Sequence, residues 1–203
     1  MIAIVDYGMG NKRSVEKALE HVGAVPRITA DGEVIRAADA VILPGVGAFP
    51  EAMRRLRATG LDAVVHEVAE AGTPLLGICL GMQLLFESST EHEGAAGLGI
   101  LAGTVTALDA PKLPHIGWNE VAFERPGALT EGLGDAAAFY HVHSFVCRPA
   151  DDDVVGRGDY GERFVSIVER GNVMGAQFHP EKSSRDGLAL LRNFARLGDR
   201  IAA

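Results

Sequence analysis

Cys79 is the residue whose surroundings point most directly to chemistry, because it lies between two glycines in Gly77-Ile78-Cys79-Leu80-Gly81. Small residues two positions either side of a nucleophile allow a sharp strand-to-helix turn that lifts its side chain out of a sheet. The dipole and the free N–H groups at the start of the following helix favour a thiolate. A cysteine without such neighbours is more often a buried structural residue. The flanking glycines therefore favour Cys79 as a nucleophile.

His179 can supply the general base that a cysteine nucleophile needs. His179-Pro180-Glu181 directly follows the apolar segment 173–178, which places it at the carboxyl end of a predicted strand. A carboxylate beside an imidazole fixes its tautomer and raises its basicity. An isolated His-Pro-Glu segment favours a surface turn, but its place after a core strand favours a Cys79–His179–Glu181 triad.

A third segment, Pro44-Gly45-Val46-Gly47, also follows an apolar stretch and suits an oxyanion-binding loop. Acyl transfer from an amide places negative charge on the carbonyl oxygen, and backbone N–H groups stabilise that charge. Glycines let a loop bring its N–H groups close, or flip a peptide to do so. On its own the pattern also fits an ordinary turn. A phosphate loop is excluded, because no Gly-x-x-x-x-Gly-Lys-Ser/Thr occurs and Gly8-Met9-Gly10 lacks the third glycine of a dinucleotide-binding fingerprint.

His141 and His143 should share one face of a strand, and such a pair can bind zinc. No further ligand stands at a suitable spacing in the sequence, so we expect neither a metal site nor a cofactor. The second cysteine, Cys147, lies near the end of the same predicted strand and is interpreted as an inert thiol.

These residues need a scaffold, and the hydrophobic pattern predicts an α/β fold. Strands and helices alternate in the first half, which indicates an open, mostly parallel sheet with helices on both faces. From about residue 100 the segments are shorter and typical of antiparallel strands. Ligand sites in such sheets lie at the carboxyl ends of the strands. The predicted strands are 2–5, 40–43, 74–78, 103–108, 119–123, 137–145, 164–169 and 173–178, and the predicted helices are 11–21, 50–57, 61–70, 81–87 and 184–197.

The chain of 203 residues has the length of one compact domain, and we expect residues 1–203 to form a single unit. Its 47% hydrophobic and 23% charged residues are typical of a globular protein. The net charge of −8 does not favour nucleic acid or a membrane as the main partner. The first residues do not resemble a signal peptide and no apolar run reaches membrane-spanning length, so the cytoplasm is the expected compartment.

The segment 77–83 together with His179-Pro180-Glu181 resembles the class I, or triad-type, glutamine amidotransferases, whose fold is flavodoxin-like. Further segments resemble one subfamily, the glutaminase subunits of imidazole glycerol phosphate synthases. They extend from residue 6 to residue 183, so the resemblance covers nearly the whole chain. These segments are Asp6-Tyr7-Gly8-Met9-Gly10-Asn11, Pro44-Gly45-Val46-Gly47-Ala48-Phe49, Pro114-His115-Ile116-Gly117-Trp118-Asn119, Val142-His143-Ser144 and Gln177-Phe178-His179-Pro180-Glu181-Lys182-Ser183.

The resemblance implies a reaction and a partner. L-Glutamine is hydrolysed to L-glutamate and ammonia through a cysteine thioester. The ammonia then travels through a (β/α)8-barrel synthase subunit, with which the chain forms a heterodimer. There it reacts with a phosphoribulosyl-aminoimidazole-carboxamide nucleotide to give imidazole glycerol phosphate and aminoimidazole carboxamide ribotide, as part of histidine biosynthesis.

The resemblance also implies roles for individual residues. Cys79 forms the γ-glutamyl thioester, His179 takes the thiol proton and delivers it to the departing ammonia, and Glu181 orients His179. The oxyanion donors are Leu80 and, after the partner reorients its loop, Gly47. The implied glutamine-binding residues are Gly45, Gln83, His143 and Ser144, and the residues implied to face the synthase subunit are Trp118, Asn119, Tyr140 and Lys182.

Two positions depart from the family pattern, because His141 replaces an expected aromatic residue and Lys12 a less basic one. Three other functions remain open. A glutaminase of another ammonia-channelling synthase, such as pyridoxal phosphate synthase, should lack the 114–119 segment. A peptidase or γ-glutamyl hydrolase of related fold would need no partner. A non-catalytic binding subunit would not need the whole predicted triad.

Overall fold

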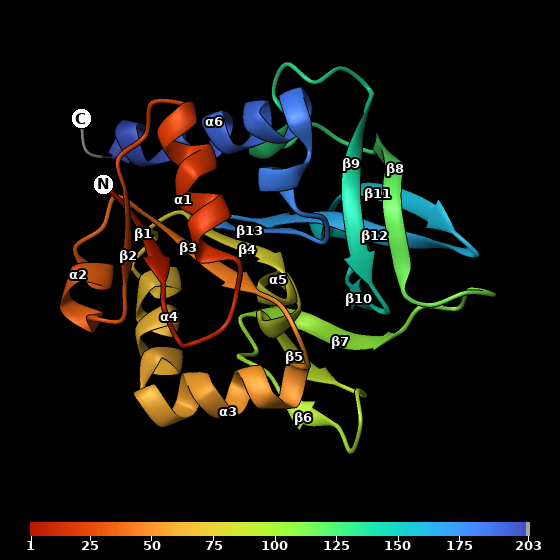
Figure 1. The fold of residues 1–203 in the computed structure, drawn as a ribbon, viewed down its shortest axis with the longest axis horizontal. Coiled ribbons are helices and arrows are strands. Elements are labelled where there is room, and N and C mark those ends of the chain that lie inside the picture. The colour runs from red at the N-terminus through yellow and green to blue at the C-terminus, as the bar shows by residue number, and fades with distance from the viewer. Residues whose placement is uncertain (202–203) are drawn as a thin grey trace.

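The computed structural model describes residues 1–201, and a large twisted sheet runs through that part of the chain (Figure 1). Neighbouring strands from β2 to β13 run parallel to each other, and each neighbouring pair from β13 to β9 runs antiparallel. In order across the sheet these strands are β2 (Pro26–Thr29), β1 (Ile2–Val5), β3 (Ala40–Gly45), β4 (Leu75–Cys79), β13 (Val173–Ala176), β12 (Glu162–Arg170), β11 (Val154–Tyr160), β8 (His115–Phe123) and β9 (Ala136–His143).

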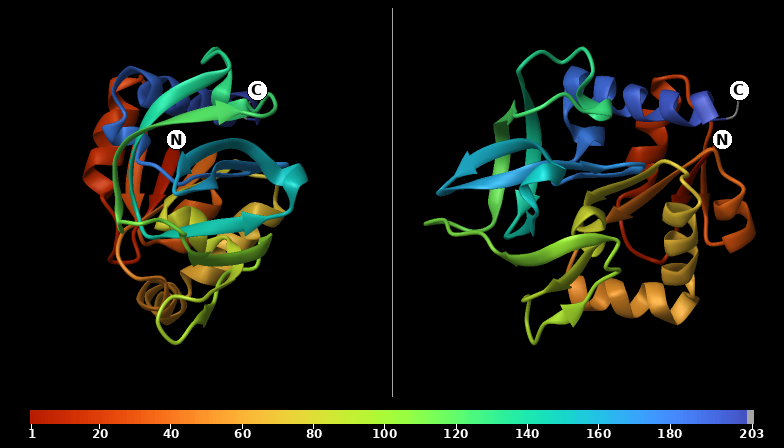
Figure 2. Two further views of the ribbon diagram at one scale, coloured as in Figure 1. Left: turned by 90° about the vertical axis from the view of Figure 1, so that its right-hand side faces the viewer. Right: turned by 180° about the vertical axis from the view of Figure 1, so that it is seen from behind.

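Helices cover both faces of the parallel part (Figures 1 and 2). Successive residues of a strand point to opposite faces, and β1 shows the division. Ile4 packs in one core with Leu19 and Phe194, whereas Val5 packs in the other core with Val65. One face carries α1 (Lys12–His21) and α6 (Ser184–Ile201), and the other carries α2 (Gly32–Arg36), α3 (Phe49–Thr59) and α4 (Leu61–Glu70).

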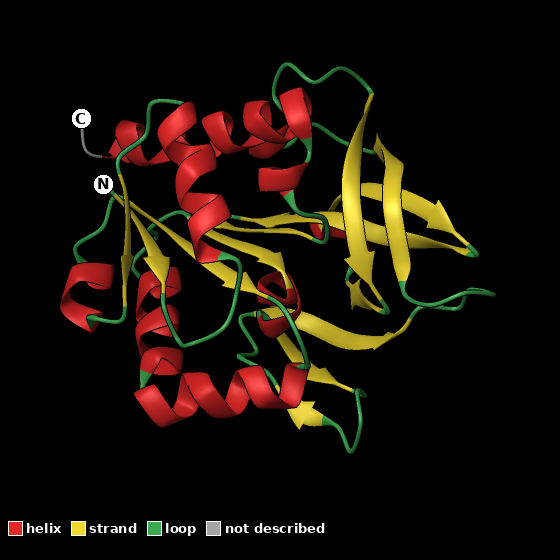
Figure 3. Cartoon of the chain, viewed as in Figure 1, coloured by secondary structure: helices red, strands yellow, loops and turns green. Residues whose placement is uncertain are grey.

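A smaller sheet lies beside the antiparallel part of the large one (Figure 3). In spatial order it contains β10 (Phe145–Pro149), β7 (Leu101–Ala107), β5 (Phe86–Ser89) and β6 (Ala95–Ala96). The chain passes from one sheet to the other at Ser144, whose carbonyl accepts a hydrogen bond of 2.9 Å from the Leu108 N–H. The prediction of one strand over 137–145 is therefore wrong, because β9 and β10 belong to different sheets.

The predicted α/β fold with a parallel first half and an antiparallel second half is confirmed. The predicted helix 81–87 is wrong beyond α5 (Leu80–Leu84), because the Leu84 carbonyl accepts from the Leu98 N–H at 2.9 Å instead of continuing the helix. The sequence pattern also did not predict β2, α2 and β11. Within residues 1–201, no helix combines the length and the apolar character that a membrane crossing requires.

Candidate active site

A pocket of about 310 Å³ opens beyond the carboxyl ends of β3 and β4. It gathers residues that follow strands far apart in the chain, as expected for an open α/β sheet. A larger hollow of about 610 Å³ lies along the 123–135 segment, but its described lining contains no thiol or imidazole. The predicted site residues that line the smaller pocket are Gly47, Cys79, Leu80, Gln83, His143, Ser144, His179 and Lys182.

Cys79 joins β4 directly to α5 in a strained backbone conformation, with φ of 55° and ψ of −113°. Such a conformation is rare for a residue with a side chain. The neighbouring glycines are needed because backbone passes close by. A Cβ atom on Gly81 would lie 1.8 Å from the Leu43 carbonyl oxygen, and one on Gly77 would lie 2.7 Å from the Gly81 oxygen. The turn thus holds the thiol at the pocket wall.

His179, which lines the pocket beside Cys79, forms a buried pair with Glu181. The distance between His179 Nδ1 and Glu181 Oε1 is 2.9 Å, and the two side chains are 5% and 1% exposed. The backbone holds the imidazole in place, because the His179 N–H donates to the Tyr140 carbonyl at 2.9 Å. Glu181 Oε2 is buried and has no hydrogen-bond partner within the described part of the chain, so the carboxylate meets His179 through Oε1 alone.

The charge state of His179 is set by its two neighbours. Burial alone would lower its pKa, but hydrogen bonds to Cys79 and Glu181, together with their negative charges, raise the pKa from 6.5 to about 10. Nδ1 faces Glu181, which leaves Nε2 for the sulfur. The raised pKa therefore favours the imidazolium form of His179, beside the Cys79 sulfur and the Glu181 carboxylate. This order of groups is that of a nucleophile, its base and a carboxylate that orients the base.

The loop after β3 and the start of α5 supply backbone N–H groups at the pocket. Leu80 begins α5, so its N–H has no acceptor inside the helix. Gly47 lines the pocket with a φ of +96°. Gly45 lies beneath the turn instead, because a Cβ atom there would be 2.6 Å from the Gly81 nitrogen. The expectation that Gly45 contacts glutamine stays a prediction.

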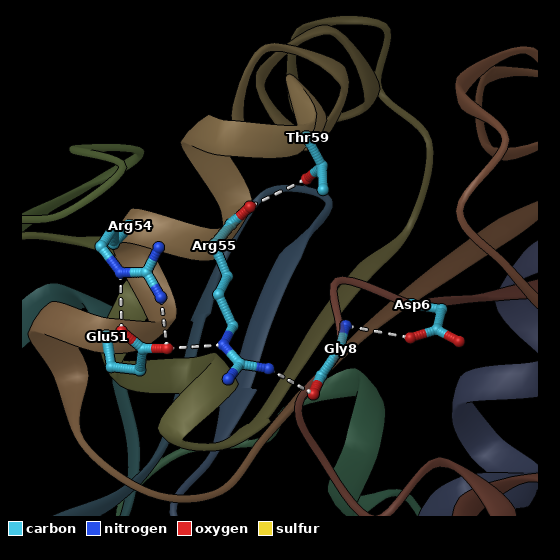
Figure 4. Close-up of polar contacts among 6 residues, drawn as sticks. All are labelled: Asp6, Gly8, Glu51, Arg54, Arg55 and Thr59. Atoms are coloured by element: carbon cyan, nitrogen blue, oxygen red, sulfur yellow. Dashed lines mark hydrogen bonds and ion pairs between the residues drawn. The ribbon is translucent and has the colours of Figure 1, made fainter.

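The loop after β1 packs against the end of β3, directly before the loop at Gly47. The buried Tyr7 hydroxyl donates to the Pro44 carbonyl at 2.8 Å. Arg55 of α3 reaches across and donates to the Gly8 carbonyl at 3.0 Å, while its Nε donates to Glu51 at 2.6 Å (Figure 4). The glycine-containing segment near the N-terminus therefore forms part of the scaffold of the candidate oxyanion loop.

Sequence reasoning did not identify Glu91, which also lines the pocket. It lies in a polar turn, without the strand-end signal of the other site residues, and its carboxylate accepts from the Phe49 N–H at 2.7 Å. Gln83 Nε2 donates to the Phe145 carbonyl and to Gln177 Oε1, both at 3.1 Å. Its Oε1 is left as an acceptor. A carboxylate and an amide oxygen together suit an ammonium group.

His141 and His143 share the buried face of β9, as predicted. Both nitrogens of the His143 ring are engaged, by the Phe145 carbonyl at 3.0 Å and by His115 Nδ1 at 3.1 Å. Burial lowers the pKa of His143 to about 4. Within residues 1–201 no three His, Cys, Asp or Glu side chains have the arrangement of a metal site. Cys147 is buried, and burial raises the pKa of its thiol.

Of the residues expected to face a partner, Trp118, Asn119 and Tyr140 lie on β8 and β9 near the pocket, whereas Lys182 ends the short 3-10 helix Pro180–Lys182 and lines the pocket. Trp118 is 55% exposed, and its ring lies 6.3 Å from that of Tyr140 across the strand pair. Ile116, on the same face of β8, is 58% exposed. Asn119 points to the opposite face and donates to the Asp159 carbonyl at 2.8 Å. Its expected contact with a partner stays a prediction.

Comparison with known proteins relates the whole chain to one family. The family described as glutamine amidotransferase class-I matches residues 3–197. The imidazole glycerol phosphate synthase subunit HisH of Moorella thermoacetica is 54% identical over 198 residues, which cover 97% of this chain and 94% of the relative. The subunit of the same name from Shouchella clausii is 50% identical over 204 residues, covering 97% and 98%.

Solved structures share the fold at lower sequence identity. A crystal structure of a glutamine amidotransferase superposes with a TM-score of 0.78 and 22% identity, covering 98% of this chain and all of that one. The structure of PurLQS from Thermotoga maritima gives a TM-score of 0.75 at 22% identity, covering 100% of this chain and 98% of that one.

Proposed function

The chain belongs to the class I glutamine amidotransferases, and we propose that it is the glutaminase subunit of an imidazole glycerol phosphate synthase. In this role it hydrolyses L-glutamine to L-glutamate and ammonia. The observation that carries this activity is the placement of His179 between Cys79 and Glu181 at the wall of a pocket.

In the proposed first step the thiolate of Cys79 attacks the side-chain carboxamide carbon of glutamine. A C–S bond forms, and the C=O electron pair moves onto oxygen. In this proposal the Leu80 N–H and a loop N–H at Gly47 stabilise the oxyanion, and both residues line the pocket. The protonated His179 then gives its proton to the departing nitrogen, the C–N bond breaks, and ammonia leaves a thioester on Cys79.

The second step returns the enzyme to its starting state. His179, now neutral, takes a proton from a water molecule that attacks the thioester carbonyl. Collapse of the second tetrahedral intermediate breaks the C–S bond and releases glutamate. Glu181 holds the Nδ1–H of His179 throughout, so that Nε2 always faces the reacting atoms.

The pocket also offers groups for the other end of glutamine. We assign the α-ammonium group to the Glu91 carboxylate and to Gln83 Oε1, which is the acceptor that remains after Gln83 Nε2 has used its two bonds. Ser144 and the loop at Gly47 line the same space. The ring nitrogens of His143 are both engaged, so its contribution to binding is through the ring surface or the backbone.

The proposed partner is a (β/α)8-barrel synthase subunit that receives the ammonia. Exposed apolar side chains beside the pocket support a docking surface there. Trp118 and Ile116 project from β8, and Val46 at the pocket is 40% exposed. Exposed aromatic and aliphatic side chains of this kind are typical anchors of protein interfaces. Docking on this side covers the pocket and keeps ammonia from escaping to water.

Glutamate release by the purified chain tests the proposal, measured alone and then with the barrel subunit and its nucleotide ligand. We expect weak activity alone and a large rise in the complex. Cys79→Ala and Cys79→Ser should abolish both. Cys147→Ala is the matched control, because this second thiol is buried away from the pocket lining, and the variant should keep its activity.

Two outcomes would contradict different parts of the proposal. Full activity in the absence of any partner would exclude the synthase assignment and favour a free-standing hydrolase. Retained glutaminase activity in Cys79→Ala would exclude the thioester mechanism.

A further inference from the structure

At and behind the pocket wall, buried polar side chains from separate elements are linked by a chain of hydrogen bonds, with the Phe145 carbonyl as the shared acceptor between His143 and Gln83. His115 comes from β8, His143 from β9, Gln83 from α5, and Gln177 from the turn after β13. Gln177 is 0% exposed. Buried polar groups are retained when they are hydrogen-bonded. The direction of each bond in this chain can be worked out from its fixed acceptors.

The backbone carbonyl of Phe145 can only accept hydrogen bonds, so it fixes the ring of His143. Nδ1 of His143 lies 3.0 Å from this oxygen and must carry the proton. Burial lowers the pKa of His143 to about 4, so the ring is neutral and its Nε2 is an acceptor. His115 Nδ1, at 3.1 Å, therefore donates to His143.

The far end of the chain gives the same directions independently. Asn119 Nδ2 donates to the Asp159 carbonyl at 2.8 Å, which orients the amide. The same nitrogen lies 3.4 Å from His115 Nε2. His115 Nε2 is therefore the acceptor, and the ring proton is on Nδ1, facing His143.

The Phe145 carbonyl also orients the two glutamines. Gln83 Nε2 lies 3.1 Å from this oxygen and must be the nitrogen of the amide. It also lies 3.1 Å from the Gln177 side chain, so the oxygen of Gln177 faces Gln83. The nitrogen of Gln177 is then turned the other way, where it lies 4.0 Å from Cys79 Sγ.

The two protonation states of Cys79 use different neighbours. The thiol can donate to the Val142 carbonyl, which lies 3.8 Å from the sulfur. The thiolate has no proton to give and needs donors instead. The Gln177 amide supplies one such donor in addition to His179, and in a buried site a hydrogen bond to a charged atom is stronger than one to a neutral atom.

We propose that the Gln177 amide stabilises the thiolate of Cys79, and that Gln83, His143 and His115 are positioning residues that hold this amide with its N–H toward the sulfur. The inference rests on the proposed role of Cys79 as the nucleophile and adds a catalytic group to that site. It also connects the nucleophile with β8, the strand that carries Trp118.

Alkylation of Cys79 by iodoacetamide, followed from pH 5 to pH 10 on the full chain, tests the proposal. Peptide mapping separates Cys79 from the buried Cys147. In Gln177→Met the rate at pH 7 should fall about tenfold, the size of one charge-assisted hydrogen bond. The half-maximal rate should move to higher pH, while the plateau at high pH stays within about twofold, because access to the sulfur is unchanged.

His115→Phe and His141→Phe complete the test as a variant and its control. His115→Phe removes the donor to His143 at a residue that does not itself line the pocket. It should slow alkylation at pH 7 by about threefold and move the half-maximal rate to higher pH. His141 lies on the same face of β9 but bonds to Ser166 and to its own strand, at 2.9 and 3.1 Å. His141→Phe should leave the pH profile unchanged.

A wild-type pH profile in Gln177→Met would overturn the proposal for the amide. If that variant does not fold, a wild-type profile in His115→Phe would overturn the positioning chain by itself. A changed plateau with an unchanged midpoint would indicate altered access rather than a stabilised thiolate, and would also overturn it. The reagent needs neither glutamine nor a partner, so this result is independent of glutaminase activity.

Discussion

The backbone of Cys79, with φ of 55° and ψ of −113°, is strained for any residue that has a Cβ atom. Such conformations cost about 1–3 kcal/mol for residues other than glycine. Replacing Cys79 by glycine or by alanine removes the sulfur in both cases, but only alanine keeps the Cβ atom. We expect Cys79→Gly to be about 1 kcal/mol more stable than Cys79→Ala in urea unfolding, because the released strain exceeds the entropy cost of glycine. Greater stability of the alanine variant would show that the turn is relaxed.

The raised pKa of His179 makes the stability of the fold depend on pH. The folded protein keeps this proton up to about pH 10, whereas the unfolded chain releases it around pH 6.5. The contribution is therefore fully present below about pH 6.5 and is lost as the pH rises through about 10. Glu181→Gln removes one of the two partners that raise the pKa of His179, so the free energy of unfolding should fall less as the pH rises. Urea midpoints from pH 6 to pH 10 check this, and an identical decline in both proteins would contradict it.

Residues at strand ends could be predicted from the sequence, and residues whose role depends on orientation could not. Cys79 and His179 each follow an apolar segment, which places them at one edge of a parallel sheet. Glu91 lies in a polar turn, and only the packing against α3 brings it to the pocket. The role of Gln177 depends on which end of its amide faces the sulfur, and the Phe145 carbonyl decides that through space.

At the scale of elements, the close crossing of β3 and α5 depends on Gly81. A Cβ atom there would lie 1.8 Å from a backbone oxygen of β3, which cannot move without breaking the sheet. We expect Gly81→Ala to lower the free energy of unfolding by more than about 3 kcal/mol, as measured by urea unfolding.

Gly72→Ala is the control for this substitution. Gly72, unlike Gly81, has a positive φ, +78°, but a Cβ atom there would meet nothing within 4 Å. It should cost only about 1–2 kcal/mol, the price of the backbone conformation. Equal losses in the two variants would mean that the crossing of β3 and α5 relaxes to admit the added Cβ atom.

Some elements could not be predicted from the sequence because tertiary packing, and not the local residue pattern, determines them. In β11, Gly156 leaves room for Val121 of the neighbouring strand, whose Cγ1 would lie 2.9 Å from an added Cβ. Glycine weakens the pattern by which a strand is predicted, so the feature that allows the packing hides the strand. The residues directly after α5 are apolar, as they would be in a buried helix. The helix nevertheless ends at Leu84, because the backbone of this segment forms hydrogen bonds with residues from Leu98 onward.

At the scale of the whole molecule, the pocket and the exposed apolar side chains lie at one end of the sheet. Trp118→Ala should weaken binding to the barrel subunit by about 30-fold, the size of an interface hot spot. Its effect on the free energy of unfolding should stay within about 0.5 kcal/mol, because the side chain is 55% exposed. Fluorescence or calorimetric titration with the barrel subunit measures the affinity.

Val25→Ala provides the matched control at the opposite end. Val25 is 69% exposed and precedes β2, at the amino edge of the parallel strands. Its truncation should change neither affinity nor stability. An equal loss of affinity in the two variants would place the docking surface away from β8.

The two ends of the described chain meet on the side of the molecule that faces away from β8 and β9 (Figures 1 and 2). Met1 and Gly198 of α6 line the same hollow, and the terminal amine pairs with Asp39. This arrangement has a practical value for bioengineering. A linker that anchors the protein to a bead or an electrode through its C-terminus would leave the mouth of the pocket pointing into solution, open to substrate and to a second protein.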